Sequence, residues 1–244
     1  MRRALLAVAL LLSATSLAMA APARIDARAE KVLGRSDKSI GAAAWNALPG
    51  VRWTFVFAQH DTMGVPRRHA WDKFSGWHRV EGKNRRGQSY VIVHKLGTSE
   101  GRAWVDGVAI EGDSLGKLVT QGERLWGHDG YWLFMPFKLR DDTVVLAYDQ
   151  ARTDKGAQQD RLHLMFEPEG DRFWIDFDRK TGRPAYWEFF HKGASEKEAA
   201  TWEGWEQHGG LWFSTKHVWD EATTLWTKDI EAVTKFDPRV FQEL

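Results

Sequence analysis

The sequence contains no cysteine among its 244 residues. This absence excludes disulfide bonds, thiol nucleophiles, thiolate metal sites and a lipid-modified amino-terminal cysteine. A protein without such cross-links must be held together by its hydrophobic core alone. About 220 residues are sufficient for a core of that kind.

Beyond the amino terminus the sequence also lacks any apolar run of the about 20 residues that a membrane-spanning helix requires. At the amino terminus, basic residues 2–3 precede the apolar stretch Ala4–Leu12, and Ala18-Met19-Ala20 is a small-x-small cleavage site. This pattern predicts a secretory signal peptide over residues 1–20, with a retained membrane anchor as the alternative. Residues 21–244 are then predicted to form a single exported domain, located in the periplasm.

Charge and motifs exclude several functional classes. Cleavage after residue 20 removes two of the 34 basic residues and leaves 32 against 33 acidic ones, a net charge of −1. Such a chain offers no strong basic surface for a nucleic-acid backbone. The sequence has no HExxH zinc motif, no GxSxG nucleophile elbow, no P-loop and no dinucleotide fingerprint. We therefore expect no nucleic-acid partner, no metal, no cofactor and no catalytic residue.

Two enzymatic alternatives remain open, because the chain has nine histidines and 33 acidic residues. His69 and His217 could converge with Asp72 on a pleated sheet, but the absence of a dense cluster favours histidines scattered over strand surfaces. An envelope hydrolase would instead need two carboxylates that face each other across a cleft. Four acidic residues in predicted strands could supply such a pair: Asp176, Glu188, Glu203 and Glu206.

Aromatic residues are abundant, with 14 tryptophans and 13 phenylalanines. Tryptophan combines a large apolar surface with one N–H donor, so it suits both a core and a ligand-binding wall. Four tryptophans flank one predicted hairpin and could stack on sugar rings: Trp202, Trp205, Trp212 and Trp219. The alternation along the strands places them on both faces of the hairpin, which argues against a flat carbohydrate-binding surface.

Residue periodicity predicts three helical regions within a long series of strands. Apolar residues at helical spacing indicate helices near residues 26–34, 36–48 and 113–128. Strong turn signals lie at Asp178–Gly182 and Gly209-Gly210. Alternating or fully apolar segments bounded by turns predict strands over residues 51–60, 67–82, 88–96, 101–107, 143–149, 160–168, 171–193, 201–221 and 224–236.

Several of these strands are apolar on both faces, including 160–168 and 171–178, so both faces must be covered. Hairpin-linked strands form a twisted antiparallel sheet, and a sheet of this length tends to curl or close. Few helices are available, and they can cover only one side. We therefore predict an α+β, mostly β fold, in which a single long curved antiparallel sheet packs a few helices on its concave side.

Segments covering nearly the whole mature chain resemble the periplasmic outer-membrane lipoprotein carrier superfamily, which has the LolA/LolB-like fold. The resemblance is greater to uncharacterised members of similar length. It rests on strand and turn patterns and includes no catalytic signature. The segments that carry it are AAAWNALPGVRWTFVF, HAWDKFSGWHRVE, YVIVHKL followed by GRAWVDG, DGYWLFMPFKLRDDTVVLAYD, and IDFDRKTGRPAYWEF.

The resemblance implies an incomplete barrel that is lidded by helices and holds lipid acyl chains in a hydrophobic hollow. The sequence departs from the carriers after Trp71, where Asp72-Lys73-Phe74 replaces an Arg-Pro pair. The lid contact of that arginine is therefore not transferred to this chain. The lipidated cysteine of the membrane-anchored relative is also missing, which leaves a membrane-associated partner open.

The sequence thus favours a monomeric, non-enzymatic periplasmic protein that binds or carries an apolar ligand, such as a lipid or an acylated molecule. Residues 131–137 would form the wall and rim of the cavity and 138–142 a solvated turn, unless this segment only fills the core. The alternatives are an envelope hydrolase, a carbohydrate-binding protein or a scaffold protein. The residues expected to line the cavity are Trp53, Phe55, Trp71, Trp104, Trp126, Trp132 and Phe134.

Overall fold

The computed structural model describes residues 24–60, 62–166, 172–190 and 195–244. The predicted signal peptide lies outside these ranges. The helices are α1 (Ala27–Ile40), α2 (Ala42–Ala47), α3 (Gly112–Lys138) and the 3-10 helix η1 (Pro238–Phe241). Within the described ranges, none of these helices has the length and hydrophobicity needed to span a membrane.

Fifteen strands make up the rest of the described fold: β1 (Gly50–Gln59), β2 (Thr62–Met63), β3 (Arg67–Asp72), β4 (Trp77–Lys83), β5 (Ser89–Lys95), β6 (Gly101–Val105), β7 (Val108–Ile110), β8 (Val144–Asp154), β9 (Ala157–Phe166), β10 (Arg172–Asp178), β11 (Pro184–Phe190), β12 (Glu198–Thr201), β13 (Glu203–His208), β14 (Leu211–Val218) and β15 (Thr223–Val233). Every strand pair is antiparallel, and the large sheet is not closed into a barrel. The predicted mostly β, open antiparallel architecture is confirmed.

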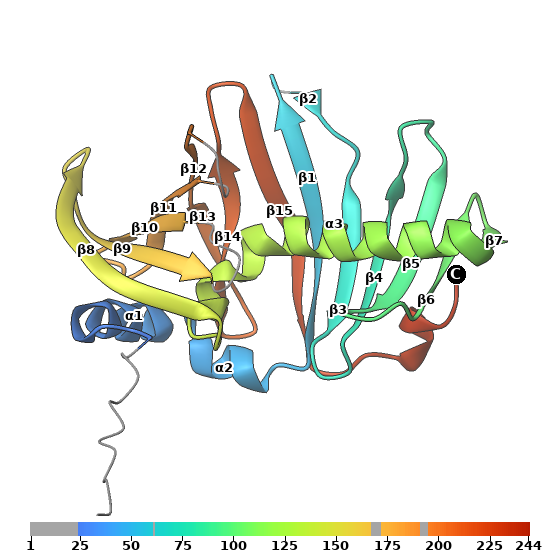
Figure 1. The fold of residues 1–244 in the computed structure, drawn as a ribbon, viewed down its shortest axis with the longest axis horizontal. Coiled ribbons are helices and arrows are strands. Elements are labelled where there is room, and N and C mark those ends of the chain that lie inside the picture. Colours follow the sequence, from blue (N-terminus) through green and yellow to red (C-terminus); the bar gives the residue numbers. More distant parts are fainter. Residues whose placement is uncertain (1–23, 61, 167–171, 191–194) are drawn as a thin grey trace, which may run out of the picture.

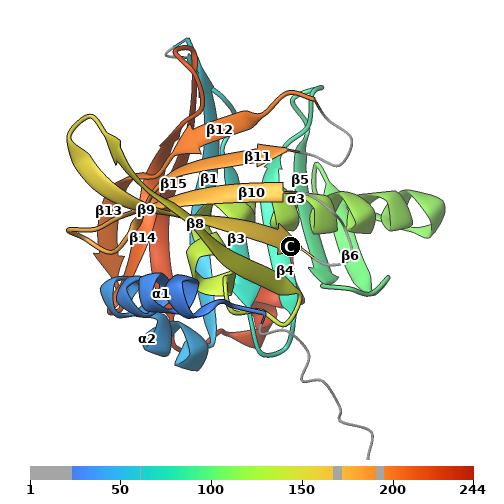
Figure 2. The ribbon, with the colours of Figure 1, turned by 60° about the vertical axis from the view of Figure 1, so that its left-hand side comes forward.

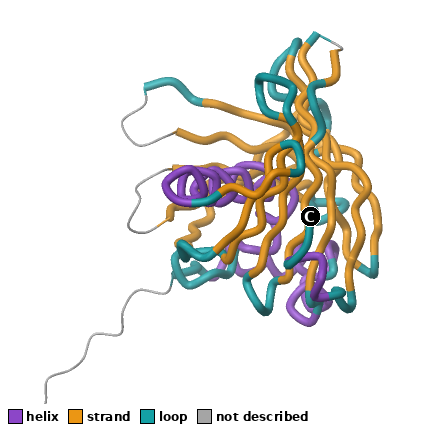
Figure 3. The backbone as a smooth tube through the Cα atoms, turned by 90° about the vertical axis from the view of Figure 1, so that its right-hand side faces the viewer, coloured by secondary structure: helices purple, strands orange, loops and turns teal. Residues whose placement is uncertain are grey.

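One detail of that prediction is wrong, because backbone hydrogen bonds divide the strands into two sheets. The large sheet has the order β13-β14-β15-β1-β3-β4-β5-β6-β7, with β2 paired to β1, and the small sheet has the order β12-β11-β10-β9-β8. Only Trp202 separates β12 from β13, and its N–H donates to the carbonyl of Ala185 in the small sheet. The small sheet crosses in front of the large one in Figure 2, and Figure 3 shows the curvature of the strands.

Helix α1 begins where the side chain of Asp26 accepts hydrogen bonds from the N–H groups of Arg28 (2.8 Å) and Ala29 (2.9 Å). The sequence predicted a break near Ser36, but Ser36 is buried inside the helix. The helix ends at Gly41, whose φ of 79° is accessible to glycine at little cost. The first two predicted helices are therefore one long helix followed by the short α2.

Helix α3 extends ten residues beyond its predicted end and runs across the concave side of the large sheet (Figure 1). Residues 131–137 are therefore helical, and Pro136 lies in the last turn. Six residues in that stretch are buried: Trp132, Leu133, Phe134, Met135, Pro136 and Phe137. A helix end that is apolar all round needs cover on every side, and the two sheets supply it. Most of this segment therefore packs in the core, while Tyr131 and Trp132 also border a cleft, so each of the two interpretations holds for part of it.

Lys73, one of the residues at which the sequence departs from the carriers, holds α2 against the β3–β4 turn. Its ammonium donates to the carbonyl oxygens of Trp45 and Leu48 at the end of α2 and lies 3.8 Å from the centre of the Trp45 ring. Burial lowers the pKa of Lys73 to about 8. Trp45 in turn stacks on Phe137 of α3 with ring centres 4.7 Å apart.

Candidate functional site

One face of α3 lines two adjoining hollows. Gln121, Arg124, Leu125 and His128 border the first, which we call the cationic pocket. Gly127, His128, Tyr131 and Trp132 border the second, which we call the apolar cleft. These positions recur every three or four residues, so they share one side of the helix. His128 belongs to both hollows and marks the boundary between them.

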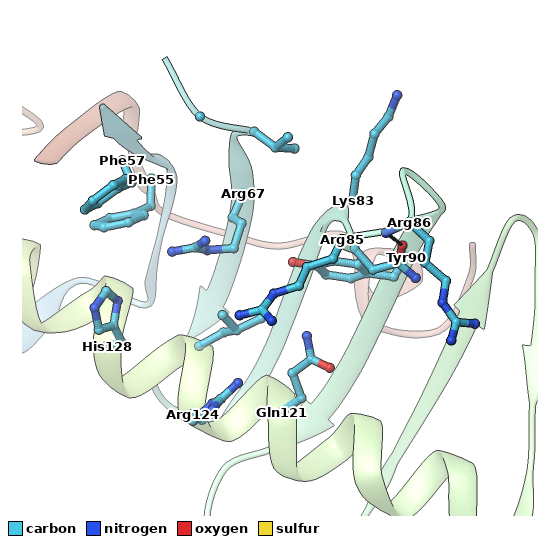
Figure 4. Close-up of a pocket in the computed structure, with 14 residues that line it drawn as sticks. Phe55, Phe57, Arg67, Lys83, Arg85, Arg86, Tyr90, Gln121, Arg124 and His128 are labelled. Atoms are coloured by element: carbon cyan, nitrogen blue, oxygen red, sulfur yellow. Dashed lines mark hydrogen bonds between the residues drawn. The ribbon is translucent and has the colours of Figure 1, made fainter. Parts of the chain in front are cut away.

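The cationic pocket is an open hollow of about 790 Å³ between α3 and the ends of β1, β3, β4 and β5 (Figure 4). Among the described residues, its lining contains five lysine or arginine residues and no acidic residue. Apolar side chains lie among these cations, so the pocket offers both positive charge and apolar surface. The lining residues are Phe55, Phe57, Gly64, Val65, Arg67, Lys83, Asn84, Arg85, Arg86, Tyr90, Gln121, Arg124, Leu125 and His128.

Most cations of this pocket form no ion pair with another described residue. Within the described part of the chain, Lys83, Arg85, Arg86 and Arg124 form no ion pair, whereas Arg67 binds Asp129. Figure 4 shows the guanidinium groups of Arg67, Arg85 and Arg124 directed toward the same space, while Lys83 extends away from it. Because like charges repel, such a group lowers its free energy when an anion enters.

The apolar cleft has a volume of about 360 Å³ and lies between α3, the small sheet and the end of β14. Rings from three elements surround it. Phe189 lies 5.9 Å from Phe173 and 5.6 Å from Trp219, and Trp219 lies 5.6 Å from Trp132, measured between ring centres. The complete lining is Gly127, His128, Tyr131, Trp132, Phe173, Phe189, Glu198 and Trp219.

A buried ionic cluster supports the floor of the cationic pocket. Asp129 of α3 is fully buried and accepts from Arg67 Nε (2.5 Å) and Arg67 Nη2 (2.7 Å). Its carboxylate also bonds to His128 Nδ1 (2.7 Å) and His69 Nε2 (3.0 Å). Burial alone would raise the pKa of Asp129, but the hydrogen bonds from His128, His69 and Arg67 hold it far below its usual range. Asp129 is therefore an anion that positions two residues of the pocket, Arg67 and His128.

From Asp129 a chain of three buried histidines crosses the large sheet. His69 Nδ1 lies 3.0 Å from His78 Nε2, and His78 Nδ1 lies 2.9 Å from His94 Nε2. An ionised carboxylate can only accept, so His69 donates from Nε2 and accepts at Nδ1. The same reasoning places the hydrogen of His78 and of His94 on Nε2. The chain of N–H groups thus points toward Asp129 in the neutral state.

The far end of this chain faces the protein surface. His94 Nδ1 lies 3.5 Å from a carboxylate oxygen of Glu123, whose side chain is 43% exposed. Burial lowers the pKa of His94 to about 4 and places that of His78 well below its ordinary value. The three rings are therefore neutral at pH 7. The expectation that the histidines are scattered over strand surfaces is wrong for these three, because adjacent strands bring them together in the interior.

The structure brings together six of the seven residues predicted to line a cavity. Trp53, Phe55, Trp71, Trp132 and Phe134 are buried in one core cluster, and Trp126 packs against it. Trp104 lies apart, in a second cluster that also includes Trp77 and Phe236. Of the seven, Phe55 lines the cationic pocket and Trp132 lines the apolar cleft.

The side chains that supply most of the charge and apolar surface of the two hollows were not predicted from the sequence. Arg67, Arg85 and Arg124 supply the charge of the cationic pocket, and Phe173 and Phe189 supply much of the apolar cleft. Only Arg85 has a local signal in the sequence, because residues 83–87, KNRRG, form a basic turn between two strands. The others become neighbours only through the packing of α3 against both sheets.

The acidic residues considered for a hydrolase are engaged in ion pairs. Arg161 donates to Asp176 from Nε and Nη2 (2.7 and 2.8 Å) and to Glu188 from Nη1 (2.9 Å). Lys197 also bonds Glu188, and Arg161 and Lys197 hold the pKa of Glu188 below its usual value despite its burial. Neither acid lines the cationic pocket or the apolar cleft. Over the described ranges, no three His, Asp or Glu side chains are placed to share a metal ion.

Comparison with known proteins supports the fold. No protein-family model matches the chain, and no curated protein matches it in sequence. A LolA superfamily protein from Nitrosomonas europaea has a similar structure, with a TM-score of 0.51 and 9% identity over 88% of this chain and 97% of that one. At this identity the similarity establishes a LolA-like fold only. The resemblance stated from the sequence is confirmed at that level.

Two further solved structures align over similar lengths. A putative outer membrane lipoprotein-sorting protein domain from Vibrio parahaemolyticus has a TM-score of 0.48 and 9% identity, covering 87% of this chain and 96% of that one. A DUF1329 family protein from Desulfovibrio piger has a TM-score of 0.49 and 10% identity, covering 86% and 96%.

Proposed function

We propose that this protein is an exported, periplasmic binding protein that takes up the apolar chain of a lipid or an acylated molecule in the apolar cleft along α3. The observation that carries this proposal is the cleft itself, whose walls are the rings of Tyr131, Trp132, Phe173, Phe189 and Trp219. Its volume of about 360 Å³ lies within the usual range for small-molecule sites. The LolA-like fold and the predicted signal peptide agree with this role.

The alternatives receive less support from the geometry. A hydrolase would need free carboxylates in a cleft, whereas Asp176 and Glu188 share Arg161. A carbohydrate platform would need exposed rings, whereas Trp202 is buried and Trp205, Trp212 and Trp219 pack against the core. A scaffold protein with a completely filled core would not need the ring-lined cleft.

Filling the cleft should weaken binding without harming the fold. Gly127 lies in α3 beside the cleft, and a Cβ atom added there has no heavy atom within 4 Å. Gly127→Phe should place a ring in the cleft and weaken binding of parinarol, an uncharged long-chain alcohol that fluoresces when shielded from water. We expect about a tenfold loss of affinity, equivalent to the burial of roughly two methylene groups.

Gly116→Phe is the matched control, since Gly116 is also an exposed glycine of α3 with free space around its Cβ position, but it does not line the cleft. Both variants should be as stable as the wild type or slightly more so, because glycine is unfavourable inside a helix. Failure of the wild type to bind parinarol, or equal binding by the wild type and Gly127→Phe, would show that the cleft is not the ligand site.

A further inference from the structure

We infer that the ligand is an anionic amphiphile, whose carboxylate or phosphate head group binds in the cationic pocket while its chain lies in the apolar cleft. The inference rests on the proposed function and adds the chemical class of the ligand. It assigns a role to the cationic pocket, which an entirely apolar ligand would leave unused.

The cationic pocket concentrates positive charge. Of the described residues, five basic side chains and no acidic one line this single hollow, although the mature chain as a whole is predicted to carry a net charge of only −1. Arg85 and Arg124 come from different elements, the β4–β5 turn and α3, and their guanidinium groups face the same space (Figure 4). Guanidinium groups bind carboxylates and phosphates through paired hydrogen bonds. The convergence of these arginines, which form no ion pair with any described residue, therefore fits an anionic group better than water alone.

The third arginine of the pocket, Arg67, is held rigidly in place. It donates two hydrogen bonds to the buried Asp129, and its guanidinium also lies 4.8 Å from the centre of the Phe55 ring. Asp129 neutralises this arginine, so the attraction for an anion must come mainly from Arg85 and Arg124, supplemented by Arg86 and Lys83. Arg67 instead forms a fixed wall of the pocket.

The pocket and the cleft border the same face of α3 and share the side chain of His128. The stretch of α3 that borders the two hollows runs from residue 121 to residue 132, a length of about 16 Å at a rise of 1.5 Å per residue. His128 lies at the junction, where its ring meets Phe55 edge-on at 5.6 Å. Phe57 and Val65, which are 40% and 53% exposed, add apolar surface to the pocket itself. A free inorganic anion would gain nothing from these apolar groups, whereas an amphiphile would bury them.

The test compares two ligands that differ only in the head group, parinaric acid and parinarol. At about pH 8 the acid is ionised, so the ratio of the two affinities reports the contribution of the charge. We expect the wild type to bind the acid about tenfold more tightly than the alcohol, a difference of ~1.4 kcal/mol. This ratio should fall as salt is raised, because the pocket is open to solvent.

Arg85→Glu/Arg124→Glu should reduce the affinity for the acid to that for the alcohol or below, while binding of the alcohol stays unchanged. The control is Lys31→Glu/Lys117→Glu, which makes the same change in net charge at two exposed lysines of α1 and α3 that line neither hollow. This control should keep the preference for the acid.

Three outcomes would overturn the inference. Equal affinities of the wild type for acid and alcohol would leave the cleft as a site for apolar chains in general, so the proposed function would stand alone. The head-group site would also be excluded if Lys31→Glu/Lys117→Glu lost the preference for parinaric acid over parinarol as completely as Arg85→Glu/Arg124→Glu. The third is tight binding of inorganic phosphate without any chain, which would make the pocket a site for free anions. In contrast, competition by millimolar inorganic phosphate against parinaric acid but not against parinarol would support the head-group site.

Discussion

Asp129→Asn should lower the free energy of unfolding by about 3–5 kcal/mol, the usual cost of removing one partner from a buried ion pair. Asp129 is fully buried and bonds to Arg67, His69 and His128. An asparagine amide can accept at only one atom and directs an NH₂ group at donors on the other side. The charge of Arg67 would also lose its compensation. Urea denaturation of the wild type and the variant measures the difference.

Glu231→Gln provides the comparison, because Glu231 pairs with Arg52 at the surface and is 57% exposed. Exposed ion pairs contribute about 0–1 kcal/mol, so this variant should remain close to the wild type. If Asp129→Asn cost no more than Glu231→Gln, the buried cluster would not be a principal support of the cationic pocket.

Acidification should destabilise the fold between pH 6.5 and pH 4. Burial lowers the pKa of both His94 and His217 to about 4, against an ordinary value of 6.5. Within this window the unfolded chain binds protons that the folded chain does not, so the free energy of unfolding falls as the pH falls. At pH 5 each of the two histidines should cost about 2 kcal/mol, from 1.4 kcal/mol per pKa unit.

Urea denaturation at several pH values should therefore give a slope of at least about 2 kcal/mol per pH unit near pH 5, since His94 and His217 each contribute about 1.2. The lowered pKa of His78 adds to the slope in the same direction. The pKa of Asp129 is lowered, and its contribution is lost only below its ordinary value of 3.8, outside this window. His217→Gln should reduce the slope by about 1 kcal/mol per pH unit. A free energy of unfolding that stays constant from pH 7 to pH 4.5 would show that these histidines are accessible to protons in the folded state.

Most of the strands could be predicted from the sequence because their signals are local. The hairpin turns at Asp178–Gly182 and Gly209-Gly210 lie between paired strands, as expected. The hairpin of β8 and β9 extends well beyond its predicted ends, because residues 149–158 are largely polar and show no apolar alternation. The helix predicted at residues 113–128 was too short for the opposite reason. Residues 131–137 are apolar on all sides, so the helical period of apolar residues cannot be recognised there.

The site could be predicted less well, because its residues meet only through tertiary packing. His78 lies directly opposite His94 in the pairing of β4 with β5, but the sequence alone does not fix that register. Arg85 and Arg124 are 39 positions apart and converge only because α3 lies across the concave side of the sheet. Of the seven aromatic residues expected to line a cavity, Phe55 and Trp132 border a hollow. The abundance of aromatic residues could not show which rings would pack together and which would border a hollow.

The most direct test of the account is a crystal structure of the protein with bound parinaric acid. We predict that the carboxylate lies within hydrogen-bonding distance of Arg85 or Arg124, and that the chain passes His128 and ends among Trp132, Phe173 and Trp219. A ligand bound elsewhere on the molecule, with the cleft beside α3 left unfilled, would contradict the account.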